Sequence, residues 1–417
     1  MNATIEKTTL LNTLEKVFAL RNPSGNPEGR QALNYLLAKG LPSVKTEEYR
    51  FIAITRLLES VMPEVPTLKP GGKISPGQLI PELACNRIVF VNGVYSPEQT
   101  EILDSSLTLS EDAPSGAKQT DDPFNLMNRA FCESLIHIHC PAKQEMKHPV
   151  AVVYYFDSTE FIFANPRWKF TVGDSGKASL VEYTVAEDGV SFFNNKHTQI
   201  SAGRQAEIEC TTIQRGAAQE IQVNNAFIDL ADNSQYQGYT FTSRGRMIRN
   251  NLTMAIDGEG INAHLYGLYY LNGQTVADNH TVVDHRKPRS YSNEVYKGIL
   301  DGNSRGVFNG KIFVRPDAQK TNAFQTNRNL LLSETATIHT KPQLEIWADD
   351  VKCSHGCTTG QLDEEALFYL QSRGLSRDAA KGMLLHAYAA ETFESMRNET
   401  IKHFVTNLVS EQLHQNG

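Results

Sequence analysis

A stretch from residue 134 to residue 360 constrains the fold most, because short strand patterns follow one another there without a helix pattern between them. Apolar residues alternate along segments such as Val181/Tyr183/Val185, and this period of two is typical of strands. Clusters of Gly, Asn and Asp, as at 173–176 and 257–260, separate the segments as turns. Without crossover helices a βαβ sheet is excluded, and a sandwich, a barrel or a parallel β-helix remains.

The length of this β region favours a solenoid, in which stacked coils bury one another's inward faces. No strict repeat is present, so periodicity alone gives only a preference. A solenoid leaves an unpaired sheet edge at each end, and such edges invite aggregation. We therefore expect the helical regions before and after the β region to cover these edges.

Helices are predicted on both sides of the β region. The predicted elements are helices over 3–20, 28–39 and 124–132, a hairpin over 87–95 around Asn92-Gly93, a proline-rich linker over 61–82, an exposed loop over 104–123, a helix over 362–372, a second C-terminal helix capped by Ser376 and a third carrying Ile401, Phe404, Val405 and Leu408. This divides the chain into an N-terminal region (1–133), a β core (134–360) and a C-terminal helical domain (361–417).

Composition limits the environment and the partners. The 417 residues carry a net charge of −7, which gives no general attraction to nucleic acid or to anionic lipid. No apolar run approaches the roughly 18 residues that a membrane span needs, and the first residues do not resemble a secretion signal. Six cysteines are too sparse for a disulfide framework at this length, so reduced thiols and a cytoplasmic location are expected.

The best candidate for chemistry is Cys353-Ser354-His355-Gly356-Cys357 at the end of the β region. Thiolate and imidazole are the ligands that iron and iron–sulfur clusters prefer. On a strand Cys353, His355 and Cys357 share one face. They would lie in a row and not around a tetrahedron, so a complete site needs ligands from elsewhere. The residues alone leave buried structural cysteines as the alternative interpretation.

Other polar motifs favour structural roles. His137 and His139 would share one strand face beside Cys140, with Ile138 buried on the other face. The cluster over 278–286 resembles an acid–base group, but it has no nucleophile beside it, so we expect a turn or a polar network at the edge of a coil. The chain contains neither the phosphate-binding Gly-x4-Gly-Lys-Ser/Thr loop nor a Gly-x-Ser-x-Gly motif.

Two segments carry a resemblance to a known family. Cys353-Ser354-His355-Gly356 is followed by Leu362-Asp363-Glu364-Glu365-Ala366-Leu367-Phe368-Tyr369-Leu370 and by Ser372-Arg373-Gly374, while the N-terminal region has Gly40-Leu41-Pro42 before Glu47-Glu48-Tyr49-Arg50-Phe51. Both segments resemble the SufB/SufD family, the scaffolds of iron–sulfur cluster assembly, and the C-terminal one is similar to SufD-like members. For the N-terminal element we expect a packing role between domains.

The resemblance implies a right-handed parallel β-helix between N-terminal and C-terminal helical regions, and a scaffold without catalytic activity of its own. It implies pairing with a SufB-like subunit through the β-helix and docking of the ATPase SufC on the C-terminal helices. In isolation such a chain can form a homodimer. The resemblance also associates the assembled complex with a flavin, for which no residue set is recognisable here.

The resemblance further implies that His355, with Cys353 beside it, acts as a metal ligand together with a cysteine of the SufB-like partner. A nascent iron–sulfur cluster or its iron would then be shared at the subunit interface. SufB-like chains carry a cysteine just before a Leu-rich strand, whereas residues 326–333 contain no thiol. Cys357 stands where the family usually has a small residue, so no role is carried over to it.

Two other classes of function remain as alternatives. A β-helix polysaccharide lyase or hydrolase would need paired carboxylates or a base with cations along one groove. The missing export signal and the apolar C-terminal helices argue against that class. A purely structural β-solenoid is the other alternative, and it predicts no nucleotide-dependent partner.

Overall fold

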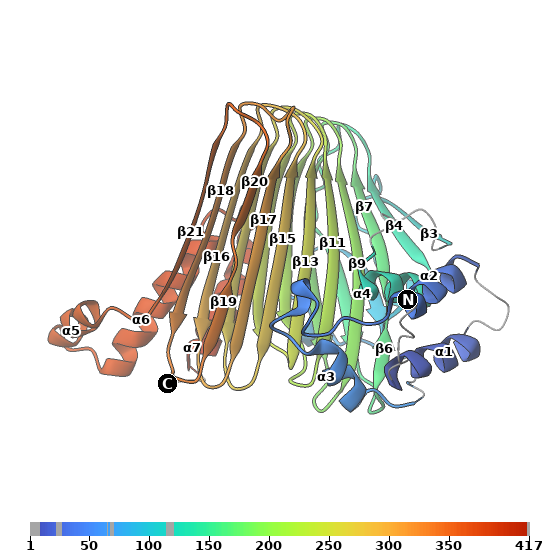
Figure 1. Ribbon diagram of the computed structural model, residues 1–417, viewed down its shortest axis with the longest axis horizontal. Coiled ribbons are helices and arrows are strands. Elements are labelled where there is room, and N and C mark those ends of the chain that lie inside the picture. Colours follow the sequence, from blue (N-terminus) through green and yellow to red (C-terminus); the bar gives the residue numbers. More distant parts are fainter. Residues whose placement is uncertain (1–8, 22–26, 65, 67–70, 114–120, 415–417) are drawn as a thin grey trace, which may run out of the picture.

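The computed structural model describes residues 9–21, 27–64, 66, 71–113 and 121–414. Its centre is a solenoid of two mainly parallel sheets, and the chain passes from one sheet to the other within each coil (Figure 1). Helices precede and follow the solenoid in the chain. The prediction of a mainly β protein with a parallel β-solenoid core and helical regions at both chain ends is therefore confirmed.

We name the two sheets A and B. Sheet B contains β2 (Val94–Tyr95), β1 (Asn86–Val91), β5 (Val150–Phe156), β8 (Lys177–Ala186), β10 (Glu207–Arg215), β12 (Gln235–Arg244), β14 (Asn262–Leu271), β16 (Tyr291–Leu300), β18 (Asn322–Leu331) and β21 (Lys352–Gly360). Sheet A contains β3 (Thr108–Asp112), β4 (Leu135–Cys140), β6 (Ile162–Ala164), β7 (Arg167–Val172), β9 (Phe192–Ala202), β11 (Ile221–Leu230), β13 (Met247–Ile256), β15 (Val276–His285), β17 (Arg305–Val314), β19 (Thr337–Thr340) and β20 (Gln343–Ile346).

The helical elements lie outside these two sheets. They are α1 (Thr9–Arg21), α2 (Pro27–Lys39), α3 (Ile54–Val61), α4 (Pro123–Phe131), α5 (Glu364–Ser372), α6 (Arg377–Ala390) and α7 (Glu399–His414), with the short 3₁₀ turns η1 (Glu47–Tyr49), η2 (Pro76–Gln78), η3 (Pro97–Gln99) and η4 (Glu391–Phe393). No helix in the described part of the chain is long and apolar enough to cross a membrane.

Neighbouring strands of each sheet pair in a regular register, one coil above the next. In sheet B, Asn262 lies beside Tyr291, Tyr291 beside Asn322, and Asn322 beside Lys352. Each step along the sheet is therefore one complete turn of the chain. Only two pairings of named strands are antiparallel, β1 with β2 and β3 with β4. β1 and β2 precede residue 134, so sheet B begins within the N-terminal region.

The space between the two sheets, the lumen, holds the main core. It is filled largely by apolar side chains such as Ile256, Leu271, Leu300 and Ile312. Within the uninterrupted described stretch 121–414, polar side chains also enter it. Gln214 donates to Asn250 at 2.7 Å, for example. Alternation places every second residue of a strand in this space.

The terminal helices cover the outer faces of the two sheets, which corrects the expectation that they cover the sheet edges. The N-terminal helices pack on sheet A, where their core includes Phe193 and Val223. Helices α6 and α7 pack on sheet B against residues such as Val153 and Ile299. The physical reason is that several strands are apolar on both faces. All seven residues of β5 are buried, and such a strand needs cover outside as well as inside.

Most predicted helices and the hairpin are present. The helix expected over 3–20 is described from Thr9, and its first residues lie outside the described part of the chain. The Asn92-Gly93 turn joins β1 to β2 with positive φ at both positions. Two elements were not predicted: α3, and β3 inside the expected loop over 104–123. α3 is only eight residues long, with Ile54 and Leu58 buried four positions apart. Four of the five β3 residues are exposed, so this strand lacks the alternation of a half-buried strand.

Candidate cluster-ligand site on the last coil

The last coil leaves one strand of sheet B only half paired. β21 pairs with β18, and no other strand of the described residues follows it in the sheet. Within β21 only Cys353 is partly buried, and the other residues are exposed. In Figure 1 β21 lies at the end of the solenoid from which α5 and α6 project. This edge is open to a partner, because its outward backbone groups have no neighbouring strand.

The candidate ligands follow one another along this strand. Cys353 packs against the lumen core. Cys357 reaches toward sheet A, where its Sγ lies 2.7 Å from Oγ1 of Thr340 in β19. His355 lies two residues from each of them, so its side chain is on the same face of the strand, and it is exposed. The three side chains therefore share the side of β21 that faces the mouth of the lumen, where no further coil closes it.

The candidate ligands do not form a complete metal site in the described residues. In the described ranges no group of three or more His, Cys, Asp or Glu side chains is arranged to hold a metal ion. Burial raises the pKa of the Cys353 thiol, so the neutral thiol is favoured until a cation approaches. His355 is exposed and can bind through a free ring nitrogen.

The residues under the candidate ligands are polar and buried. Gln325 lies beside His355 in the register, and its Nε2 donates to Oε2 of Glu294 in the preceding coil at 2.5 Å. Burial raises the pKa of Glu294 to about 7. Neither residue is a predicted site residue. Glu294, Gln325 and His355 are separated in the sequence by about one coil each, so that they lie side by side in the sheet. This spacing has no meaning until the number of residues in a coil is known.

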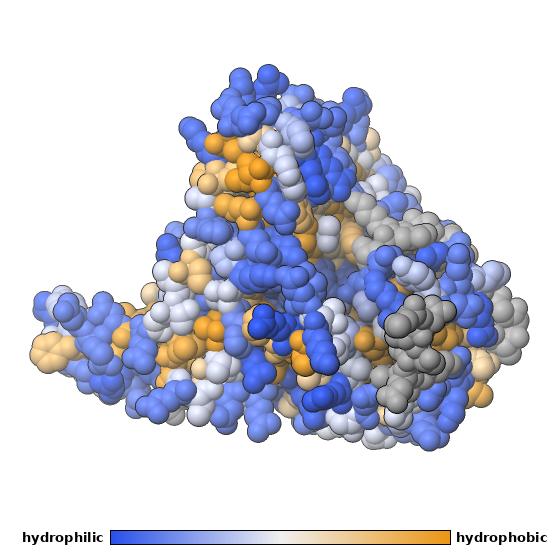
Figure 2. Space-filling model, viewed as in Figure 1, coloured by the Kyte–Doolittle hydropathy of each residue, from blue (hydrophilic) through white to orange (hydrophobic). Residues whose placement is uncertain are grey.

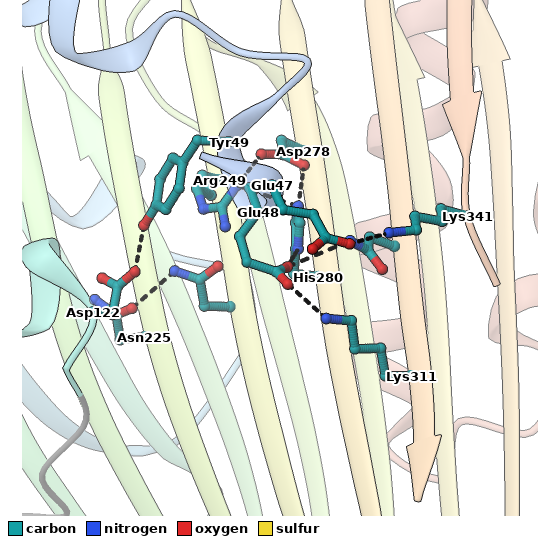
Figure 3. Close-up of polar contacts among 12 residues, drawn as sticks. Glu47, Glu48, Tyr49, Asp122, Asn225, Arg249, Asp278, His280, Lys311 and Lys341 are labelled. Atoms are coloured by element: carbon teal, nitrogen blue, oxygen red, sulfur yellow. Dashed lines mark hydrogen bonds and ion pairs between the residues drawn. The ribbon is translucent and has the colours of Figure 1, made fainter. Parts of the chain in front are cut away.

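The N-terminal motif forms the other large polar cluster (Figure 3). η1 lies on the outer face of sheet A, where Glu48 contacts His280 at 3.3 Å and Lys311 at 2.6 Å. His280 also contacts Asp278 at 2.9 Å. The pKa of Glu48 is lowered to about 2 by its hydrogen bond to His280 and by the Lys311 charge, although burial opposes this shift.

Tyr49 completes this attachment from the buried side of η1. Its hydroxyl donates to Asp122, and the guanidinium of Arg249 stacks over its ring at 4.0 Å. Arg249 also pairs with Asp278. The expectation of a packing role for the N-terminal motif and of a polar network at 278–286 is therefore confirmed, and the structure adds that the two motifs contact each other.

The other residues of interest, His137, His139 and Trp168, have packing and hydrogen-bonding roles in the solenoid. His137 and His139 lie on the outer face of β4 and are partly buried, while Ile138 and Cys140 are buried on the lumen side. Nε2 of His137 lies 3.0 Å from the Thr171 hydroxyl. Trp168 is buried and donates to the Tyr154 hydroxyl at 2.6 Å. None of these residues belongs to the last coil.

The C-terminal helices carry an exposed apolar surface. Phe368 and Tyr369 of α5 are 74% and 58% exposed, and Met383 of α6 is 56% exposed. α5 projects away from the solenoid (Figure 1), and hydrophobic residues are visible at this projecting end (Figure 2). We call Phe368, Tyr369 and Met383 the α5–α6 apolar surface. Exposed aromatic residues are enriched at protein-binding sites.

The fold defines a β-solenoid protein whose last strand in sheet B, β21, carries the candidate ligands Cys353 and His355. Residues 155–388 match the family described as SUF system FeS cluster assembly, SufBD core domain. The chain belongs to this SufBD family. Membership makes it a component of Suf iron–sulfur cluster assembly and leaves the polysaccharide-active alternative without support.

The similarity extends beyond the core domain. The chain is 29% identical over 412 residues to the iron-sulfur cluster assembly protein SufD of Escherichia coli (strain K12), covering 95% of each chain. It is 30% identical to a SufBD family protein of Synechocystis over 85% of this chain and 84% of the relative. It is also 26% identical to the chloroplastic protein ABCI7 of Arabidopsis thaliana, over 90% and 83% of the two chains.

Proposed function

We propose that this chain is a SufD-type, non-catalytic scaffold subunit that pairs with a SufB-like subunit and docks a SufC-like ATPase. The observation that carries the proposal is the open last coil, which presents His355 on an exposed edge strand. Similarity to SufD over nearly the whole chain supports the choice of the SufD type.

Pairing with a SufB-like subunit would use the open end of the solenoid. A second solenoid can continue sheet B at β21, because an edge strand binds another strand through main-chain hydrogen bonds. The side chains of His355 and Cys357 are already exposed there, so the pairing would cover groups that are otherwise open to water. The same edge would serve a homodimer of this chain when the partner is absent.

The ligand role follows from this pairing. We place the imidazole of His355, and beside it the thiol of Cys353, at the seam between the two subunits. A cysteine of the SufB-like partner would supply the thiolate that residues 326–333 lack. The nascent iron–sulfur cluster is then a cargo shared by two chains, which fits a set of ligands too small to bind iron alone.

Docking of the ATPase would use the α5–α6 apolar surface. Phe368 is the most exposed of the large apolar side chains in the described residues. Burying such a side chain at an interface contributes about 2 kcal/mol. Because α6 also packs on sheet B through Leu385, a movement of the ATPase can act on the solenoid through a rigid helix. The six free cysteines are compatible with a reducing cytoplasm, where we place the protein.

Co-purification and reconstitution test the proposal. Tagged full-length chain is co-expressed with a SufB-like and a SufC-like protein, and the complex is assayed for transfer of a cluster to an apo-ferredoxin. We expect one stable complex of all three proteins, active only when this chain is present. Failure to recruit either partner, or undiminished transfer without this chain, contradicts the proposed role.

A further inference from the structure

A cavity that the proposed function does not use lies between the segment around α3 and one edge of the solenoid. Its volume is about 600 Å³. Phe51, Ala53 and Leu57 form one wall. The other wall is formed by the turns that lead from sheet B into sheet A, at the starts of β13, β15 and β17.

The charge of this cavity is unusual for an acidic protein. Three arginines line it, Arg244, Arg246 and Arg305, and no carboxylate does. Within residues 121–414 and the other described ranges, the guanidinium groups of Arg244 and Arg246 form no hydrogen bond or ion pair. That of Arg305 donates only to the Phe51 carbonyl, at 3.4 Å. The chain as a whole has a net charge of −7.

Arginines at the opposite edge of the solenoid behave differently. In the turns that lead from sheet A into sheet B, Arg204 pairs with Asp174, Arg286 with Asp257 and Arg289 with Glu259. Each of these arginines is neutralised by a carboxylate of the preceding coil. The three arginines of the cavity are thus a concentration of positive charge without an internal counter-charge.

The backbone that carries these arginines is well fixed. Gly245 has a φ of +145°, and a Cβ there would lie 2.7 Å from Cδ1 of Ile248, so the turn requires glycine. The N–H groups of Arg246 and Met247 both donate to the Glu220 carbonyl, at 2.9 and 3.2 Å. Arg305 is attached in the same way through its N–H to the Thr275 carbonyl at 3.0 Å.

The geometry points to an organic phosphate as the ligand, with at least two phosphate groups on a planar ring system, as in a nucleoside diphosphate. Guanidinium groups bind phosphate oxygens in pairs, and three of them match a multivalent anion better than a single carboxylate. The ring system would pack on the partly buried side chains of Phe51 and Leu57. The ring of Phe51 is held in place, because it stacks on His339 with a centroid distance of 4.2 Å.

Calorimetric titration of the full-length chain tests this inference. The ligands are ADP, inorganic pyrophosphate and adenosine, in a buffer of low ionic strength. We expect ADP to bind at least five-fold more tightly than pyrophosphate, because only ADP uses the apolar wall, and adenosine to give no measurable binding. Absence of ADP binding at millimolar concentration overturns the inference, and equal affinity for ADP and pyrophosphate overturns the role of the apolar wall.

Variants localise the site. Arg244→Gln and Arg246→Gln should each weaken ADP binding about ten-fold, the usual loss for one charge-assisted hydrogen bond. Ala53→Glu places a carboxylate in the cavity from an exposed position at the start of α3 and should weaken binding at least as much. Arg289→Gln, at the opposite edge, is the matched control and should leave binding unchanged.

Two results would reject the site even if ADP binds. Equal weakening by Arg289→Gln and Arg246→Gln would show a general effect of charge. If a short single-stranded oligonucleotide binds more tightly than ADP, and the arginine variants weaken its binding equally, the ligand of this site is a nucleic acid and not a small organic phosphate. Unchanged thermal unfolding of each variant shows that a loss of binding is not a loss of fold.

Discussion

His355 lies directly beside Gln325 in the register of β21 and β18, so the exposed imidazole stands at the end of a column of lumen-facing residues. Gln325 continues the column inward through its hydrogen bond to Glu294. Both of these side chains are buried, and one carboxylate oxygen of Glu294 and the carbonyl oxygen of Gln325 have no hydrogen-bond partner in the described structure. The candidate ligand is therefore backed by polar groups and not by the apolar core.

Replacing the imidazole tests the ligand role. His355→Ala should lower cluster transfer by the reconstituted complex at least ten-fold, because one ligand of the shared site is lost. Assembly of the complex should survive, since the exposed side chain contributes little to folding. Size-exclusion chromatography reports assembly, and the visible absorbance of the acceptor reports transfer.

Ser354→Ala is the matched control for this variant. Ser354 is exposed on the same strand but points to the opposite side, so transfer should stay near the wild-type rate. A wild-type transfer rate in His355→Ala would contradict the assignment of His355 as a cluster ligand. A loss of equal size in Ser354→Ala would show that the strand, and not the imidazole, is needed.

Glu294→Gln should stabilise the protein at alkaline pH. Burial raises the pKa of Glu294 from its ordinary value near 4.5 to about 7. The unfolded chain therefore binds fewer protons than the folded one between these values, and stability falls as the pH rises from 4.5 to 7. The shift corresponds to roughly 3 kcal/mol at pH 8. Urea midpoints at pH 5 and pH 8 should differ less in the variant than in the wild type.

Gln325→Leu separates the charge of Glu294 from its hydrogen bond. It removes the donor to Glu294 while leaving the carboxyl in place, so the pH dependence should become steeper. If the midpoints of Glu294→Gln follow the wild-type pH profile, the carboxyl does not titrate in this range.

Glu48→Gln should loosen the N-terminal region. The lowered pKa of Glu48 stabilises the folded protein at every pH above 4.5, and this contribution is lost as the pH falls from 4.5 toward 2. Since the side chain is 41% exposed, solvent screening reduces the effect to about 1 kcal/mol. Limited proteolysis at neutral pH should cleave the variant faster between α2 and α4.

Glu47→Gln provides the comparison for Glu48. Glu47 lies next in the chain and pairs with Lys341, but it is 70% exposed. Proteolysis of Glu47→Gln should therefore stay close to that of the wild type. Equal sensitivity of the two variants would show that the Glu48–His280 contact has no special part in holding η1 on sheet A.

Phe368→Ser should weaken binding of the SufC-like ATPase without changing the stability of the isolated chain. The side chain is 74% exposed, so its removal leaves the core intact, whereas an interface would lose a large apolar contact. We expect the dissociation constant to rise at least ten-fold in a surface-binding assay. Glu365→Gln, an exposed change on the same helix, should bind like the wild type. Unchanged binding by Phe368→Ser would move the docking site away from α5.

Local sequence patterns were sufficient for most elements. The Asn92-Gly93 turn has the positive φ values that its sequence predicts. Ser376 caps α6 by accepting from the Ala379 N–H at 3.1 Å, and Asp363 caps α5 in the same manner. These contacts join residues within a few positions of one another, so their energies depend on the local sequence and not on the fold.

The placement of the helices could not be derived in the same way. Nothing in the sequence of α6 indicates that Leu385 packs on sheet B while Met383 faces outward. The buried residues of this helix are Ala380, Leu385 and Ala389, whereas Met383 is 56% exposed. The direction of a helix face is decided by the surface against which it packs, and that surface is assembled from strands far apart in the chain.

The alternation and the turns by themselves determined a core of many short strands without crossover helices, because strand period and turn chemistry act over a few residues. They only favoured a solenoid over a sandwich or a barrel, which differ in how distant strands pair. Only the tertiary structure decided which groups meet. It brings Glu48 to His280, Arg246 to the wall formed by Phe51, and His355 to the open end of a polar column. Such contacts depend on the number of residues in each coil and on how coils stack, and these properties belong to the packed chain as a whole.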